Sequence, residues 1–252
     1  MAVVALCLTV FGVVYAATDS NPTGASDSAL NYHGRIRTVQ MALTIDTGQR
    51  YQLNGTIDAN IDSGRWRATV SVPLFFSTAT VTAILANDHA YVTSPSVPAS
   101  LGKQWLSVPF QTPDVIALAS TLADFRTNLF CLNAIGPVKV TTSGPYTTYT
   151  VTGSVPKNTC FVPAIIASIP RVTVSVTLAR KGQVASATIV AGVAPAQIRV
   201  HLEVLSYNSP VVIRVPPANQ VQPLPAGALQ RILSGQTPIT KLLTPAGVKS
   251  LV

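Results

Sequence analysis

Residues 197–205, QIRVHLEVL, place an apolar side chain at nearly every second position. The same alternation recurs in residues 38–45 (TVQMALTI), 66–73 (WRATVSVP) and 171–178 (RVTVSVTL). A period of two is typical of β-strands that have one wet face and one dry face. These stretches therefore predict a large antiparallel sheet with one apolar side.

Two stretches break the strand pattern and favour helix. In residues 113–130, Thr112 is placed to cap the helix and Pro113 suits its first position, while residues 161–169 suit a shorter helix that ends before Pro170. The predicted order is strands, helix, strands, short helix, strands, with a last strand at 211–215. We therefore expect an α+β fold, a curved antiparallel sheet (half-barrel) with a few helices on its concave face.

The composition divides the chain into four segments. Residues 1–17 contain an apolar run that is short for a membrane span and ends in small residues, which predicts a signal peptide or, alternatively, an N-terminal anchor. Residues 18–35 are turn-rich and form a predicted linker, 36–215 form the sheet domain, and 216–252 form a Pro-rich basic tail. We expect export to the periplasm or cell envelope, or secretion.

Beyond the predicted signal, the chain has two cysteines, Cys131 and Cys160. In an exported protein an even pair indicates a disulfide. Closing this loop would stabilise the fold by about 3 kcal/mol in the chain-entropy model. Two cysteines without a nearby histidine offer too few ligands for a metal site, so no metal is expected.

Charged residues make up only 10% of the chain, hydrophobic residues 48%, and the net charge is +8. The basic residues are scattered and do not form the patch interleaved with aromatics that is typical of nucleic-acid binding. A weak positive field suits a membrane or envelope surface as partner, and an ordinary solvated surface explains it equally well.

No group of residues predicts catalysis. The three histidines, His33, His89 and His201, fall in the linker, beside a turn and on the polar face of a strand. The chain has no G-x-S-x-G, phosphate loop, dinucleotide fingerprint or calcium loop. We therefore expect a protein that is not an enzyme and has no cofactor.

The dry faces of the predicted strands are the candidate binding surface. Their candidate residues are Val39, Met41, Leu43, Val70, Val72, Val174, Val176, Ile198, Val200 and Leu202, covered by Ile116, Leu122 and Phe125 of the longer helix. Two helices are few for so large a sheet, which favours a partly open interior, while a close-packed core is the alternative. Trp66 and Trp105 would lie at the rim of a pocket or at the edge of such a core.

Four stretches together resemble one known family. They are Leu53-Asn54-Gly55-Thr56-Ile57-Asp58, Asp88-His89-Ala90-Tyr91-Val92, Gly102-Lys103-Gln104-Trp105 and residues 207–216 (YNSPVVIRVP). The chain resembles, over about 36–222, the actinobacterial LprG/LppX-type envelope lipoproteins, which share a half-barrel with the LolA carriers. The resemblance implies an apolar cavity for the acyl chains of an envelope lipid or lipoglycan. The N-terminal helix of that family and its lipid-attachment cysteine are not matched here.

These observations lead to two functional expectations. The first is an exported, lipid-binding or lipid-transport protein that holds acyl chains in an apolar cavity. The alternative is a non-catalytic envelope module with a solid core, whose C-terminal tail docks on an envelope protein.

Overall fold

The computed structural model describes residues 36–46, 48, 52–60, 62–73, 78–87, 89–109, 136–154, 171–179, 183–192, 197–225 and 244–250. These residues form twelve β-strands: β1 (Thr38–Asp46), β2 (Gln52–Asn60), β3 (Arg65–Pro73), β4 (Thr78–Ala86), β5 (His89–Thr93), β6 (Trp105–Pro109), β7 (Val138–Ser143), β8 (Tyr146–Gly153), β9 (Val172–Leu178), β10 (Val184–Ala191), β11 (Ile198–Tyr207) and β12 (Val221–Pro223). The predicted strands up to residue 206 are confirmed, each within a few residues.

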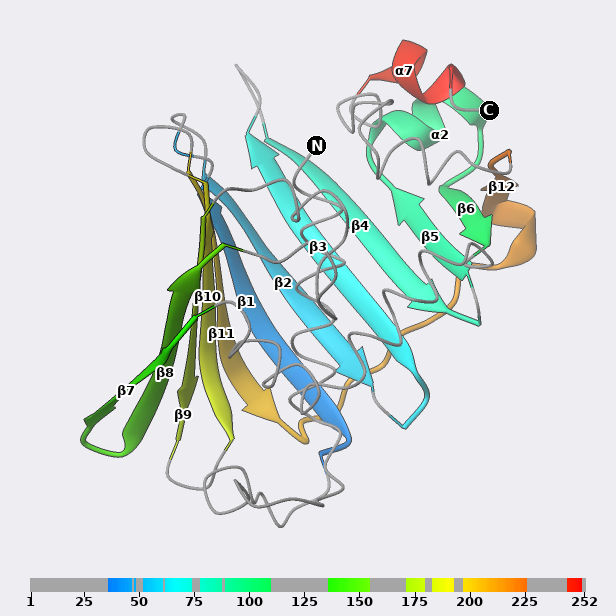
Figure 1. The fold of residues 1–252 in the computed structure, drawn as a ribbon. Helices are drawn as coiled ribbons and strands as arrows, with labels where there is room; N and C mark the ends of the chain where they lie inside the picture. The colour runs from blue at the N-terminus through cyan, green and yellow to red at the C-terminus, as the bar shows by residue number, and fades with distance from the viewer. Residues whose placement is uncertain are drawn as a thin grey trace.

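All twelve strands belong to one open sheet, in the order β12-β6-β5-β4-β3-β2-β1-β11-β10-β9-β8-β7. Neighbours are antiparallel except for β12, which pairs with β6 in parallel, so the sheet is mixed. Because β1 pairs with β11, the first strand meets the eleventh in the middle of the sheet, while the last strand, β12, lies at one edge. In Figure 1 β2–β4 are seen face-on while β7–β10 stand nearly edge-on, so the sheet is strongly bent.

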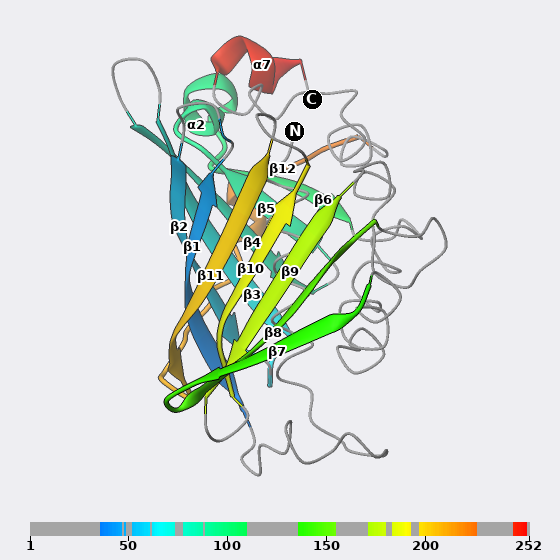
Figure 2. The same ribbon diagram turned by 60° about the vertical axis from the view of Figure 1, so that its left-hand side comes forward.

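The expected α+β fold with helices on the concave face is wrong. In the described part of the chain the α-helices are α2 (Ser96–Leu101) and α7 (Pro245–Lys249), six and five residues long. They contact each other and lie beyond the β5–β6 end of the sheet (Figures 1 and 2). The strand pattern dominates because β-branched residues at alternating positions pack well on a pleated surface. The stretches expected to be helical, 113–130 and 161–169, lie outside the described residues.

The segment after β11 does not continue the antiparallel sheet. Residues 211–215, expected to be a strand, form an extended strap (residues 208–217) that passes behind β4 in Figure 1. The strap leads to a 3-10 helix, η1 (Ala218–Gln220), and then to β12 at the sheet edge. Asn60 Nδ2 donates to the carbonyl of Val211 at 3.2 Å, and Arg65 Nη1 donates to that of Ile213 at 3.3 Å.

Several predictions fall on residues that the structure does not describe. They are the signal peptide or anchor in 1–17, the whole linker at 18–35, and the Cys131–Cys160 disulfide. Within the described part of the chain, no helix is long and apolar enough to span a membrane.

Candidate functional site

The pleat divides the side chains of β1–β11 between two faces. Register places Val39, Met41, Leu43 and Ile45 of β1 on the same side as the apolar residues of the neighbouring strands. We call this side the inner face, and the side that carries the strap the outer face. The described residues of β1–β11 place no charged side chain on the inner face. A surface of this kind holds apolar groups and repels ions.

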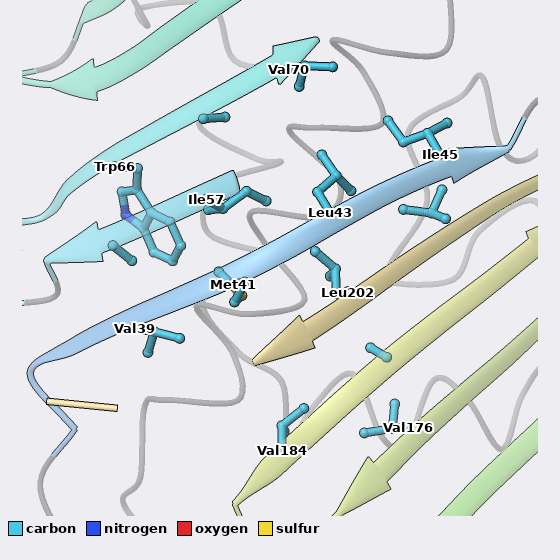
Figure 3. Packing of buried hydrophobic residues seen from close by; sticks show 14 of the residues in the cluster. Val39, Met41, Leu43, Ile45, Ile57, Trp66, Val70, Val176, Val184 and Leu202 are labelled. Carbon is cyan, nitrogen blue, oxygen red and sulfur yellow. The ribbon is translucent and has the colours of Figure 1, made fainter. Parts of the chain in front are cut away.

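Burial on the inner face is uneven, and buried residues such as Leu106 of β6 and Val151 of β8 occur far from its centre as well as in it. Val39, Met41, Leu43 and Ile45 are almost fully buried, as is Ile57 of β2. Figure 3 shows these side chains on one side of the sheet with Trp66, Val70 and Leu202. Residues farther out or near strand ends remain partly exposed: Val72, Leu85, Tyr149, Val174, Ile189, Ile198 and Val204. The inner face therefore combines sealed positions, among them all four of β1, with partly exposed apolar positions, here called its flanks, that water still reaches.

The candidate residues in described segments come together on this face. They are Val39, Met41 and Leu43 of β1, Val70 and Val72 of β3, Val174 and Val176 of β9, and Ile198, Val200 and Leu202 of β11. The β1–β11 pair, which connects distant parts of the chain, joins the strands β1–β3 to the strands β9–β11. The helix residues Ile116, Leu122 and Phe125 lie outside the described residues.

Sequence reasoning missed other members of the same face. Ile45, Ile57, Tyr149 and Ile189 all belong to it or pack against it. Each follows the same alternation as a neighbouring candidate, so extending the period-two pattern to the strand ends would have found them. On β11 the period-two pattern is interrupted by a β-bulge, which shifts the β1–β11 register between Gln40 and Met41.

The two tryptophans lie on opposite faces. Trp66 of β3 is buried within the inner-face cluster. Trp105 of β6 is on the outer face, where it packs with Ile84, Val211 and Ile213 beneath the strap. The sheet therefore separates the two residues that were expected together at a rim or a core edge.

Hydroxyl groups on the inner face occur mainly at the β7–β8 end of the strand order, and one lies on the central strand β11. Among its described residues they belong to Thr142 of β7, Thr147 and Tyr149 of β8, and Tyr207 of β11. The Tyr207 hydroxyl donates to the carbonyl of Val184 at 2.6 Å. The β7–β8 hairpin is thus the part of this face best suited to hydrogen-bond a polar group next to an apolar one.

The outer face is polar and internally hydrogen-bonded. Hydroxyl pairs connect β8 to β9: Thr148 with Thr177 at 2.9 Å, Thr150 with Ser175 at 3.1 Å, and Thr152 with Thr173 at 2.9 Å. Such cross-strand pairs stabilise a sheet modestly. Polar side chains on this part of the outer face are thus paired with one another, in contrast to the largely apolar inner face.

The two described histidines lie outside the inner face. His201 of β11 has Nδ1 2.8 Å from Thr188 Oγ1, and His89 of β5 has Nδ1 3.0 Å from the carbonyl of Asn87. Neither histidine bonds a serine hydroxyl or a carboxylate in these contacts, as a nucleophilic triad would require. Among the described residues, no group of three or more His, Cys, Asp or Glu side chains is placed to hold a metal ion.

Comparison with known proteins identifies no family for this chain. The chain matches no protein-family model, and no curated protein matches its sequence. An uncharacterized conserved protein from Thermus thermophilus is 9% identical, with a TM-score of 0.41 over 74% of this chain and 90% of that one. A LolA superfamily protein from Nitrosomonas europaea is 8% identical, with a TM-score of 0.28 over 84% and 96%. A beta-barrel-like protein of a domain of unknown function from Brucella abortus is 10% identical, with a TM-score of 0.20 over 68% and 98%. Similarity at this level identifies no function.

Proposed function

We propose that this chain is an exported, non-catalytic protein that binds the acyl chains of an amphiphilic envelope lipid against the inner face of its sheet. Transport or presentation of that lipid in the cell envelope is the role that such binding would serve. The polar head group would remain at the rim, where water and hydroxyl groups are available.

One observation carries the proposal: a single uncharged, apolar face extends over β1–β11, and its flanks are partly exposed. A sheet that only needed a closed core would be expected to seal Val174, Ile189 and Val72 as fully as Met41. Exposed apolar surface of this kind commonly marks a site for a ligand or a partner.

The physical driving force suits an acyl chain. Each methylene removed from water contributes about 0.8 kcal/mol, so even a partly buried chain gives useful affinity without any directional contact. A free charged head group on the inner face would find no counter-ion among its described residues, which favours amphiphiles that keep their charge outside.

The position of the C-terminal tail bears on the alternative function, an envelope module whose tail docks on another protein. Its described parts contact the domain itself: β12 pairs with β6, and α7 packs on α2. Lys103 Nζ and the Gln104 N–H donate to the carbonyls of Asn219 and Gln220 at 2.9 and 3.0 Å. These contacts give the tail a role within the fold and do not favour the second function.

Two neighbouring residues of β10 allow a matched test. Ile189 packs on the inner face, and Val190 lies on the outer face opposite Arg199. We would measure uptake of a fluorescent fatty acid and of phospholipid from vesicles by the full chain, by Ile189→Asp and by Val190→Asp. Loss of uptake in Ile189→Asp alone is the expected result. Equal uptake by both variants, or none by the unchanged chain, would contradict the proposal.

A second inner-face variant guards against misfolding. Val174→Thr keeps the shape of the side chain and adds a hydroxyl where an acyl chain would lie. We expect weaker uptake with an unchanged far-ultraviolet circular dichroism spectrum. Native mass spectrometry of the unchanged chain after purification from a lipid-containing host, followed by organic extraction, would then identify the class of any bound lipid.

A further inference from the structure

The two edges of the sheet differ in how open they are. At one edge, β12 has three residues and ends at Pro223, and the following N–H of Leu224 donates back to the carbonyl of Ser107 at 2.8 Å. At the other edge, β7 has six residues, of which Lys139–Ser143 are all exposed. Figures 1 and 2 show β7 as the outermost strand on its side of the sheet, next to β8. An open strand edge is a template for pairing with another strand.

The turn between β7 and β8 determines which backbone groups face that edge. Gly144, with φ 55°, and Pro145 form a two-residue loop between the paired residues Ser143 and Tyr146. Because such a loop is closed by a hydrogen-bonded pair, Ser143 directs its N–H and C=O toward β8. The alternation then directs those of Val138, Val140 and Thr142 away from β8, to the open edge.

The same three residues carry the inner face to the end of the sheet. Val138 and Val140 lie opposite Val151 and Tyr149 of β8, and the side chain of Val140 is 53% exposed. This apolar row ends at an exposed valine, beside backbone groups that pair with no other strand in the described part of the chain, and another strand added there would extend it.

The sequence of β7 fits a second copy of itself. In a symmetric antiparallel pair centred on Val140, Val140 lies opposite Val140 of the second copy, Val138 opposite Thr142, and Lys139 opposite Thr141. Every such pair joins residues of the same face, so the register is consistent with the pleat. Lys139 is the single charged residue in 136–154, and it meets a threonine in this register, so no like charges oppose each other.

We propose that β7 is a homodimerisation edge, through which two copies of this chain pair antiparallel about Val140. The pairing joins the two sheets and the two inner faces into one continuous apolar surface. It requires only the strand edge, so it is independent of whether the inner face binds lipid. A strand pair buries little area, which predicts a weak dimer with a dissociation constant roughly in the micromolar range.

A charge exchange at residue 140 tests the register. Sedimentation velocity would be measured on the full chain in a nonionic detergent, from about 5 to 500 µM. We expect concentration-dependent dimers of the unchanged chain. Val140→Lys and Val140→Glu should each raise the dissociation constant about tenfold or more, because two like charges then face each other. An equimolar mixture of the two variants should recover the dimer.

Leu205→Lys is the matched control, because Leu205 is 59% exposed and lies on β11, away from the edge. It should dimerise like the unchanged chain. The proposal is overturned if the unchanged chain is monomeric throughout this range. It is also overturned if Val140→Lys and Val140→Glu fail to recover on mixing, or if Leu205→Lys weakens the dimer as much as they do. The apolar segment 2–17 is common to all variants, so it cannot produce a difference that depends on residue 140.

Discussion

Asp58 of β2 and Arg67 of β3 are opposite each other on the outer face, with Arg67 Nη2 2.5 Å and Nε 3.0 Å from the same carboxylate oxygen, Oδ2. The other oxygen of Asp58 accepts from Gln40 Nε2 at 3.1 Å, and Gln40 Oε1 accepts from Ser206 Oγ at 2.9 Å. This chain of contacts connects β3, β2, β1 and β11. It therefore joins two parts of the sheet that are far apart in the sequence.

Asp58 is the residue on which that network depends, since it is 8% exposed and accepts on both oxygens. Asp58→Ala should lower the free energy of unfolding by about 1–3 kcal/mol, because it leaves Arg67 and Gln40 without their acceptor. Thr56→Ala, an exposed residue two positions away on the same face, is the control and should change it little. Urea unfolding measures both. Equal effects would show that the network adds no stability.

Gly55 occupies a position of β2 where there is no room for a side chain. A Cβ at residue 55 would collide with the carbonyl oxygen of Thr69 on the paired strand and press on Val70. Gly55→Ala should therefore destabilise the fold by about 1–3 kcal/mol through forced backbone movement. Thermal unfolding followed by circular dichroism measures this cost.

Gly64 provides the comparison for Gly55. It has φ 61°, and nothing lies within 4 Å of a Cβ built there. Gly64→Ala should cost only about 1 kcal/mol, from the left-handed backbone conformation. A cost for Gly55→Ala no greater than that for Gly64→Ala would contradict the steric explanation.

Leu43 and Val72 compare the sealed centre of the inner face with its flank. Leu43 is 1% exposed, so Leu43→Ala should lower the free energy of unfolding by about 2–5 kcal/mol. Val72→Ala should cost clearly less, because the side chain is partly exposed and removes less area from water. Equilibrium unfolding in urea gives both values. Similar costs would mean that the flank is as closely packed as the centre.

The strap is held by the side chains that it directs toward the sheet. Ile213 is buried against Ile84 and Ala86, while its neighbour Val212 is 69% exposed. Ile213→Ala should cost about 2–5 kcal/mol and increase hydrogen exchange in residues 208–217. Val212→Ala should change stability by no more than about 0.5 kcal/mol. Unchanged exchange in Ile213→Ala would show that the strap is held by other contacts.

The strands could be predicted because their signal is local. The alternation in 171–178 and 197–205 already specifies which side chains share a face, and the turn residues at 62–64 and 143–145 specify the hairpins. The predicted fold class was wrong because two stretches with a helical pattern, 113–130 and 161–169, were expected to form helices on the concave face of the sheet. Residues 211–215 show the limit of the same reasoning: their alternation is real, but it matches a strap on the outer face as well as a strand.

The sequence by itself determined the strands and the apolar and polar sides of each. It also determined the small number of charged residues, none of which falls on the inner face of the described strands. Only the tertiary structure decided that β1 pairs with β11, that the strap covers Trp105, and that β7 is left at an open edge. The physical reason is that alternation is encoded between neighbouring residues, whereas strand order depends on backbone pairing between distant segments, which no local pattern specifies.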